Sequence, residues 1–199
     1  MQTQTDPKSQ RLFENDFLES LTHVHHTTPH FLYIPVIILS IFFGFKMGAA
    51  SEIGGAGLVL LGFFNWTLFE YWMHRLLFHY KPKSKMGERF VYLFHGIHHD
   101  FPNEKDRLVM PTVTSIGIGL AVFLIHYGLA GPKGLFLYAG FLIGYLYYEY
   151  VHYSVHNSKL KIGWTEWQRK NHLKHHFQDS KNRFGVSTPM WDVVFGTDK

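Results

Sequence analysis

The chain has 199 residues, no cysteine, and 19 lysine and arginine against 15 aspartate and glutamate residues, giving a formal net charge of +4. A chain of this length forms one domain of ordinary size. The lack of cysteine excludes disulfides, iron–sulfur clusters, thiolate nucleophiles and the common structural zinc sites. The basic residues form no stripe apart from the apolar segments, so we expect no nucleic-acid partner and attribute the charge to contact with anionic lipid headgroups.

The first thirty residues are polar and include Asp6, Glu14, Asp16 and Glu19. We expect residues 1–30 to form a cytosolic arm with a short amphipathic helix over Arg11–Leu21. A signal peptide is not expected, because that requires an apolar stretch where these acidic residues stand.

Four apolar segments follow, and each contains at most one charged residue. They cover residues 31–50, 53–73, 112–130 and 134–151. Each has about the ~20 residues needed to cross the hydrocarbon core of a bilayer. Four buried helices of a soluble protein are the alternative, but an aromatic content of 18% favours the membrane. We therefore predict an all-α integral membrane protein with four transmembrane helices in two hairpins.

The charges predict the orientation of these helices. Seventeen of the 19 lysine and arginine residues lie outside the two short hairpin turns, in the N-terminal arm, in residues 74–111 or in residues 152–199. The positive-inside rule then places both termini on the cytosolic side, with 74–111 and 152–199 forming a cytosolic helical cap. The membrane would be the endoplasmic reticulum in a eukaryote or the inner membrane in a bacterium.

Ten of the fifteen histidines form four clusters just after apolar segments or within the cap. The clusters are His74 with His79; His95, His98 and His99; His152 with His156; and His172, His175 and His176. Residues three and four apart share a helix face, so each His-x-x-His-His run should point three imidazoles at one spot. His74 and His79 are five apart, and we expect the turn near Pro82 to bring the second side chain round. Because even an octahedral ion takes six ligands, ten imidazoles predict two metal ions.

Imidazole suits zinc, copper, iron and nickel, so the ligand type does not select the metal. A soluble di-iron carboxylate bundle needs Glu-x-x-His on each of two helices and two further glutamates. Only Glu149 and His152 fit that spacing. An all-imidazole dimetal centre at the membrane surface remains, suited to activating dioxygen beside an acyl chain.

Several residues near the clusters have predicted supporting roles. Glu149 and Asp192 are candidates for carboxylates that orient ligating imidazoles. Tyr148, one turn before His152, is a candidate for lining an acyl path. Glu70 lies one turn before His74 and needs a partner, either Arg75 or a ligand histidine. The remaining histidines are interpreted as interfacial polar residues: His23, His25, His26, His30 and His126.

Residues 12–197 resemble the fatty acid 2-hydroxylases. The resemblance rests on His74-Arg-Leu-Leu-Phe-His79, on His95-Gly-Ile-His98-His99-Asp-Phe-Pro, on Arg107-Leu-Val-Met-Pro111 and on His172-Leu-Lys-His175-His176-Phe. Phe184-Gly-Val-Ser-Thr and Trp191-Asp-Val-Val-Phe-Gly196 extend it into the tail. The His-x-x-His-His run is shared with desaturases, whereas the Arg-Leu-Val-Met-Pro and Trp-Asp-x-Val-Phe-Gly segments are more discriminating.

The resemblance implies a membrane mono-oxygenase over residues 31–199, with two irons bound by the ten clustered histidines. It would use dioxygen to hydroxylate the carbon next to the carboxyl of long-chain fatty acyl lipids, yielding 2-hydroxy fatty acids or hydroxylated sphingolipids. Zinc can replace iron in recombinant protein. Family members often carry a histidine where this chain has Asn157, which we expect to be an outer hydrogen-bonding group.

Some relatives carry a fused b-type cytochrome domain, and the thirty-residue arm is too short for one. We therefore expect a separate electron donor, such as a b-type cytochrome or a ferredoxin with its reductase. Two alternatives keep part of this interpretation. One is a desaturase or a sterol or carotenoid hydroxylase with the same centre; the other, from another class, is a metal transporter.

Overall fold

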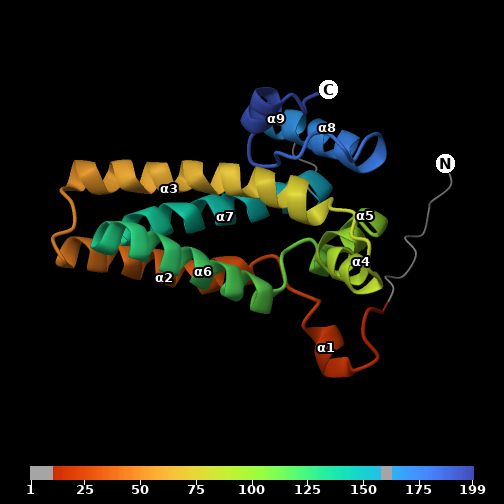
Figure 1. Cartoon of the computed structure of the whole chain (residues 1–199), viewed down its shortest axis with the longest axis horizontal. Helices are drawn as coiled ribbons and strands as arrows, with labels where there is room; N and C mark the ends of the chain where they lie inside the picture. The colour runs from red at the N-terminus through yellow and green to blue at the C-terminus, as the bar shows by residue number, and fades with distance from the viewer. Residues whose placement is uncertain (1–10, 158–162) are drawn as a thin grey trace.

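The regular structure of the chain is helical wherever a computed structural model describes it, in residues 11–157 and 163–199. The predicted all-α fold is thus confirmed for these residues. Four long helices run side by side along the long axis of the molecule (Figure 1). They are α2 (Thr28–Lys46), α3 (Glu52–Trp72), α6 (Thr112–Ala130) and α7 (Gly134–Asn157).

The ends of these helices follow from local sequence. Pro29 stands in the first turn of α2, which therefore begins before residue 31, where the apolar segment starts. Gly48, at φ 63°, allows the chain to leave α2. The side chain of Ser51 accepts a hydrogen bond from the Gly54 N–H and caps α3. Helix α6 has the predicted bounds, and α7 continues beyond residue 151 to Asn157.

Helix α7 is the centre of the bundle and packs against α2, α3 and α6. Its contact with α3 is a backbone contact. A Cβ atom at Gly140 would lie 1.9 Å from the Val59 carbonyl oxygen, and one at Gly62 would lie 2.0 Å from that of Leu137. This reciprocal pair of glycines fixes the distance between the two helices that carry Glu70 and Glu149 toward the histidines.

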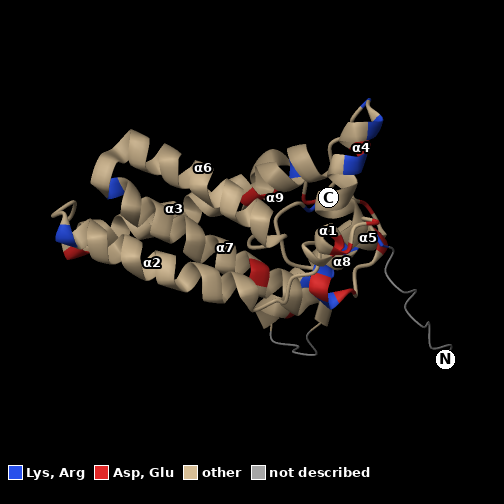
Figure 2. Cartoon of the chain, turned by 90° about the horizontal axis from the view of Figure 1, so that it is seen from below, with Lys and Arg blue, Asp and Glu red and all other residues tan. Residues whose placement is uncertain are grey.

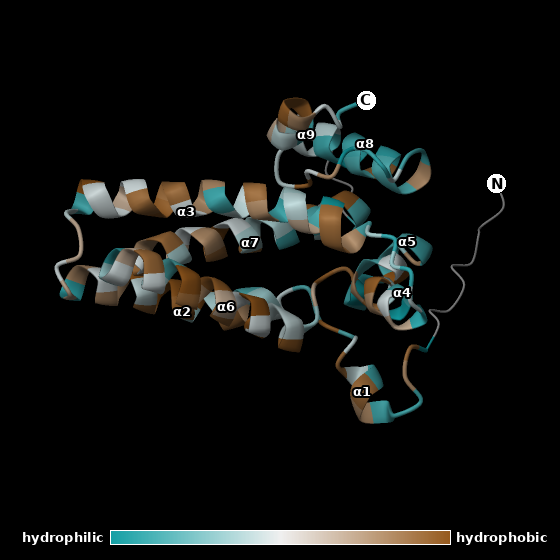
Figure 3. Cartoon of the chain, in the orientation of Figure 1, coloured by the Kyte–Doolittle hydropathy of each residue, from teal (hydrophilic) through white to brown (hydrophobic). Residues whose placement is uncertain are grey.

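The outer faces of the bundle are apolar. Ile53 and Leu129 are 88% and 84% exposed, as expected for side chains that face lipid and not water. Among the described residues, three helical stretches are long and apolar enough to cross a membrane: Thr28–Lys46, Glu52–Phe78 and Lys105–Asn157. The last contains both α6 and α7. These features are those of a membrane protein, and Figure 3 shows that the hydrophilic colours concentrate in the helices beyond the bundle.

The short elements gather at one end of the bundle, where most of the charged residues also lie (Figures 1 and 2). We call this set of elements the cap. It contains η1 (Met73–Phe78), α4 (Lys85–Val91), η2 (Tyr92–Gly96), α5 (Ile97–Asp100), η3 (Lys105–Arg107), α8 (Gly163–Phe177) and α9 (Met190–Phe195). Two further short elements lie outside the cap: η4 (Gly131–Lys133) joins α6 to α7, and α1 (Asp16–Ser20) belongs to the N-terminal arm.

The N-terminal arm contains a shorter helix than expected, α1 (Asp16–Ser20). The Glu19 carboxylate accepts hydrogen bonds from the Leu12 and Phe13 N–H groups, each at 2.9 Å. These bonds fold the preceding segment back over α1, so the helix does not extend to residue 11. Residues 1–10 of the predicted arm lie outside the described part of the chain.

Candidate metal centre

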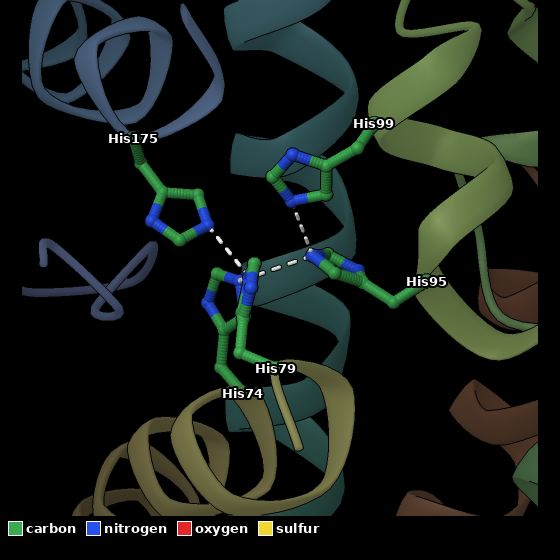
Figure 4. Close-up of side chains that lie close together, drawn as sticks. All are labelled: His74, His79, His95, His99 and His175. Atoms are coloured by element: carbon green, nitrogen blue, oxygen red, sulfur yellow. Dashed lines mark hydrogen bonds between the residues drawn. The ribbon is translucent and has the colours of Figure 1, made fainter. Parts of the chain in front are cut away.

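The ten clustered histidines come together where the bundle meets the cap, in two groups of five. The first histidine group is His74, His79, His95, His99 and His175; the second histidine group is His98, His152, His156, His172 and His176. Within each group the candidate ligand atoms all lie within 4.8 Å of one another. Figure 4 shows the first group, with imidazoles converging from η1, α8 and the segment that holds η2 and α5.

The contacts inside each group join Nε2 atoms. In the first group, His74 lies 3.1 Å from His95 and 3.2 Å from His79, and the pairs His95–His99 and His79–His175 are both 2.9 Å apart. In the second group, the Nε2 atoms of His98 and His152 are 2.9 Å apart, and His172 lies 3.0 Å from both His156 and His176.

These separations fit a bound metal ion. Two imidazole nitrogens held about 2.1 Å from one ion at a right angle lie about 3.0 Å apart. The donor set is neutral and nitrogen-only, which suits zinc, copper, iron or nickel. The residues present therefore fit two metal ions, one in each histidine group.

The prediction that each His-x-x-His-His run points at one spot is wrong. His95 and His99 belong to the first group but His98 to the second, and His172 and His176 belong to the second group but His175 to the first. Successive residues on a helix diverge by about 100°, because a turn holds 3.6 residues. The first and fifth residues of a run therefore share a direction, whereas the fourth residue faces the other group.

The explanation expected for His74 and His79 is also wrong. His74 lies in η1 and His79 directly follows it; in this π-helical turn the His79 N–H donates to the His74 carbonyl at 3.2 Å. A π turn holds more than four residues, so side chains five apart point the same way. The π turn therefore brings the His79 side chain beside that of His74 before the chain reaches Pro82.

The Nδ1 atoms of three histidines hydrogen-bond to backbone carbonyls. His74 Nδ1 lies 2.6 Å from the Phe184 oxygen, His175 Nδ1 lies 2.6 Å from the Asn182 oxygen, and His152 Nδ1 lies 3.1 Å from the Leu108 oxygen. A carbonyl only accepts, so Nδ1 donates and the lone pair of each ring is on Nε2. These contacts fix the tautomer that a metal needs. The sequence gives no indication of them, since backbone carbonyls carry no side-chain signature.

The candidate carboxylates do not contact imidazoles. Glu149 accepts from the Met110 N–H at 3.2 Å, and Asp192 accepts from the Phe184 and Gly185 N–H groups, each at 2.8 Å. The two partners expected for Glu70 are wrong: its Oε1 atom accepts from the backbone of Val186 and Ser187. Arg75 donates instead to the Tyr71 hydroxyl at 2.8 Å.

Burial keeps the cap histidines neutral. It lowers the pKa of His79 and His99 to about 3, with the neighbouring His175 adding to the effect, and that of His175 itself to about 4. Burial likewise holds the pKa of His95, His98 and His172 well below the ordinary value. A neutral imidazole is the form that binds metal.

A cavity lies beside the histidines, where the cap meets the end of α7 and the N-terminal arm. His95, His98 and His152 line it together with Tyr148, Phe94 and Met110. The Tyr148 ring stacks on that of His152, with centroids 5.4 Å apart. We call this space the histidine cavity. Tyr148 lies in its wall, and its role in lining an acyl path stays a prediction.

The remaining candidates lie outside both groups. Asn157 donates to the Tyr153 carbonyl at 3.4 Å and contacts no imidazole there. The His26 ring stacks on Tyr153, and His126 lies against Phe141 in the bundle.

His23 lies 2.9 Å from Arg107, which also pairs with Glu19 at 2.5 Å. The motif Arg107-Leu-Val-Met-Pro111 is thus tied to the N-terminal arm, a link that sequence reasoning missed.

The fold and site define a class: an all-helical membrane protein with two groups of five imidazoles at one end of its bundle. Comparison with known proteins gives the family. The fatty acid hydroxylase family model matches residues 59–197. The visible hydroxylase domain of full-length Scs7p has a similar structure, with a TM-score of 0.85 and 33% sequence identity over 92% of this chain and 69% of that one.

The curated relatives of this chain are named as members of the same family. A dihydroceramide fatty acyl 2-hydroxylase of Arabidopsis thaliana is 35% identical, over 94% of this chain and 79% of its own length. The fatty acid 2-hydroxylase of Homo sapiens is 33% identical, over 94% of this chain and 56% of its own length. The chain belongs to the fatty acid hydroxylase family.

Proposed function

We propose that this protein is a di-iron mono-oxygenase that hydroxylates the carbon next to the carbonyl of long-chain fatty acyl groups. The observation that carries the proposal is the pair of all-histidine groups, each with Nε2 atoms 2.9–3.2 Å apart. Imidazole suits several metals, and membership of a family of oxygen-inserting enzymes supports iron among them. When bound, the two irons supply the activation of dioxygen and accept the electrons that its reduction requires.

The chain's own contribution is to position the acyl group. The histidine cavity shares Met110 with a second, apolar cavity inside the bundle that Trp66, Phe69 and Leu142 help to line. An acyl chain packed against these apolar side chains, with its carbonyl at the cap, would have its second carbon nearest the histidines. Deeper carbons stay out of reach. Positioning of this kind accounts for regioselectivity without an acid–base residue.

The proposed substrates are long-chain acyl groups as free acids, thioesters or sphingolipid amides. The names of the curated relatives support an acyl lipid, because they include dihydroceramide fatty acyl and fatty acid 2-hydroxylases. The products would be 2-hydroxy fatty acids or hydroxylated sphingolipids.

We further propose four spans, with the cap and both termini on the cytosolic side. The four long helices and the gathering of charge at the cap end support this topology (Figure 2). Tags at Met1 and Lys199 should both be inaccessible from the outer or lumenal side of sealed vesicles. Protection of only one tag would contradict the four-span count.

A separate electron donor would dock on the cap. Lys81, Lys83 and Lys85 precede or open α4 and give this surface positive charge suited to an acidic redox protein. Purified protein should therefore turn over repeatedly only when a b-type cytochrome or a ferredoxin with its reductase is added. Sustained turnover with a nicotinamide cofactor and oxygen alone would contradict this.

The reaction is tested by expression in a host that lacks 2-hydroxy lipids, under labelled dioxygen. Mass spectrometry should find one labelled oxygen atom on the second carbon of acyl products, and none with the His98→Ala variant. A double bond, or a hydroxyl further along the chain, would instead show a desaturase or another hydroxylase of the same superfamily.

A further inference from the structure

The segment 182–187, which joins α8 to α9, connects two buried carboxylates to the first histidine group. Four successive N–H groups of this segment donate to carboxylate oxygens. Those of Phe184 and Gly185 bond to Asp192 at 2.8 Å each, and those of Val186 and Ser187 bond to Glu70 at 2.6 and 2.9 Å. The segment is therefore held from both sides by negative charge.

One peptide unit of this segment touches both a carboxylate and a metal-facing imidazole. The Phe184 carbonyl and the Gly185 N–H belong to the same peptide group. Its N–H donates to Asp192 Oδ2 at 2.8 Å, and its oxygen accepts from His74 Nδ1 at 2.6 Å. Asp192 is 1% exposed and His74 is 3% exposed, so water screens neither contact.

This arrangement joins the carboxylate to the imidazole through a polarised amide. A carboxylate that accepts from the N–H of an amide increases the negative charge on its oxygen, since hydrogen bonds in a chain polarise one another. A stronger acceptor at Nδ1 raises the basicity of Nε2, the atom that faces the rest of the first group. In many metal sites a carboxylate accepts directly from the Nδ1–H of a ligand histidine and raises the basicity of its Nε2 in the same way.

The second histidine group has a looser version of this connection. The Leu108 carbonyl accepts from His152 Nδ1, but Glu149 accepts from the Met110 N–H, which belongs to a different peptide unit. Asp192 is thus linked through one amide to the first group and has no such link to the second.

We propose that Asp192 is a positioning residue that raises the metal affinity of the first histidine group through the peptide between Phe184 and Gly185. This inference rests on the proposed metal centre. The sequence suggests that Asp192 orients a ligating imidazole, and the structure adds the route, which is one peptide unit and not a direct contact. The Gly185 position fits this role, because a Cβ there would lie 2.1 Å from the Thr188 oxygen and would push the peptide away.

The test is zinc binding to the full-length, chelator-treated protein in detergent, measured by competition with a chromophoric chelator. Wild-type protein should bind two ions. Asp192→Asn, which keeps the shape but removes the charge, should weaken one ion by about 10–100-fold and leave the other unchanged. In the His98→Ala background, which lacks a ligand of the second group, Asp192→Asn should weaken the remaining ion as well. Asp192→Glu restores the charge and should recover part of the affinity.

A matched control separates positioning from general stability. Gln168 donates to the Val186 and Ser187 carbonyls at 3.1 and 3.0 Å, so it anchors the same segment without touching the peptide behind His74. Gln168→Leu should lower the thermal stability and leave both zinc affinities unchanged. The proposal is overturned if Asp192→Asn binds both ions as wild type does, or weakens both equally, or if Gln168→Leu reproduces its effect. If the iron-loaded protein bound two ions tightly but formed no 2-hydroxy product, the proposed function would be overturned. The zinc affinities would still decide the role of Asp192.

Discussion

The imidazole of His99 stacks on that of His176, with ring centroids 4.1 Å apart and ring planes 19° from parallel, although the two belong to different histidine groups. Each of these residues is the last histidine of its His-x-x-His-His run. The two runs thus meet face to face, and each supplies ligands to both groups. This contact places the two histidine groups directly beside one another, as the proposed pair of metal ions requires.

The division of the runs predicts different effects for two adjacent histidines. His98→Ala should remove the ion of the second group, and His99→Ala should remove the ion of the first. The double variant His98→Ala/His99→Ala should therefore lose both ions, whereas His98→Ala/His152→Ala, within one group, should lose one. Elemental analysis of the purified variants gives the ratio of metal to protein. Equal metal loss in the two double variants would contradict the assignment of the groups.

The sequence predicts which histidines gather, but not how they divide. Helical spacing indicates that His95, His98 and His99 lie near one another. Whether they bind one metal ion or two depends on where the other His-x-x-His-His run, on α8, packs against them. Similarly, the carboxylate of Glu70 lies inside an apolar segment and therefore needs a hydrogen-bond partner. The partner lies 116 residues away in the chain and is a backbone N–H, which has no signature in the sequence. The four apolar segments were predictable because hydropathy acts locally, whereas the ends of α2 and α7 differ from the expected 31–50 and 134–151.

The glycine contact between α3 and α7 predicts a sharp packing requirement. Gly140→Ala should destabilise the protein by about 1–3 kcal/mol or more, because the new methyl group meets the Val59 backbone, which no side-chain rotation relieves. Metal content should fall with it, since α3 and α7 lead to His74 and His152. The measurement is thermal unfolding in detergent, followed by metal analysis.

A matched substitution lies on the same pair of helices. A Cβ at Gly57 of α3 meets nothing within 4 Å, so Gly57→Ala should be neutral or slightly stabilising. If Gly140→Ala unfolded at the same temperature as Gly57→Ala, the two backbones would have to lie further apart than the structure shows.

The buried histidines predict how the metal-free protein responds to acid. In the folded chain the pKa is about 3 for His79 and His99 and about 4 for His175, against an ordinary 6.5. Between these limits the unfolded chain binds more protons than the folded one, so protonation favours unfolding. The stability is therefore complete above pH 6.5 and is lost progressively as the pH falls toward 3–4.

Thermal unfolding of chelator-treated protein between pH 7 and pH 5 checks this expectation. The unfolding temperature should fall across that range, and the fall should be smaller in His79→Gln/His99→Gln, which lacks two of the titrating groups. An unfolding temperature independent of pH over the range would show that these imidazoles are hydrated when the metal is absent.

The N-terminal arm is held to the cap by ion pairs of the buried Arg107 side chain with partly exposed glutamates. Arg107 has a side chain that is 3% exposed, and it pairs with Glu19 of α1 at 2.5 Å and with Glu104 at 3.5 Å. The Val24 N–H also donates to the Asp106 carbonyl at 2.7 Å, next to this pair. Because Arg107 lines the histidine cavity too, the same side chain links the arm to the wall of the site.

Arg107→Gln should destabilise the protein by about 1–3 kcal/mol, because it leaves two partly exposed carboxylates without their cation. The arm should then become accessible to protease at low concentrations that leave the wild type intact. Arg11→Gln is the matched control: Arg11 and Asp16 form a surface pair with side chains 51% and 92% exposed, so its loss should change little. If both variants kept wild-type stability and resistance, the arm would be held by its apolar contacts, and Arg107 would serve the cavity wall alone.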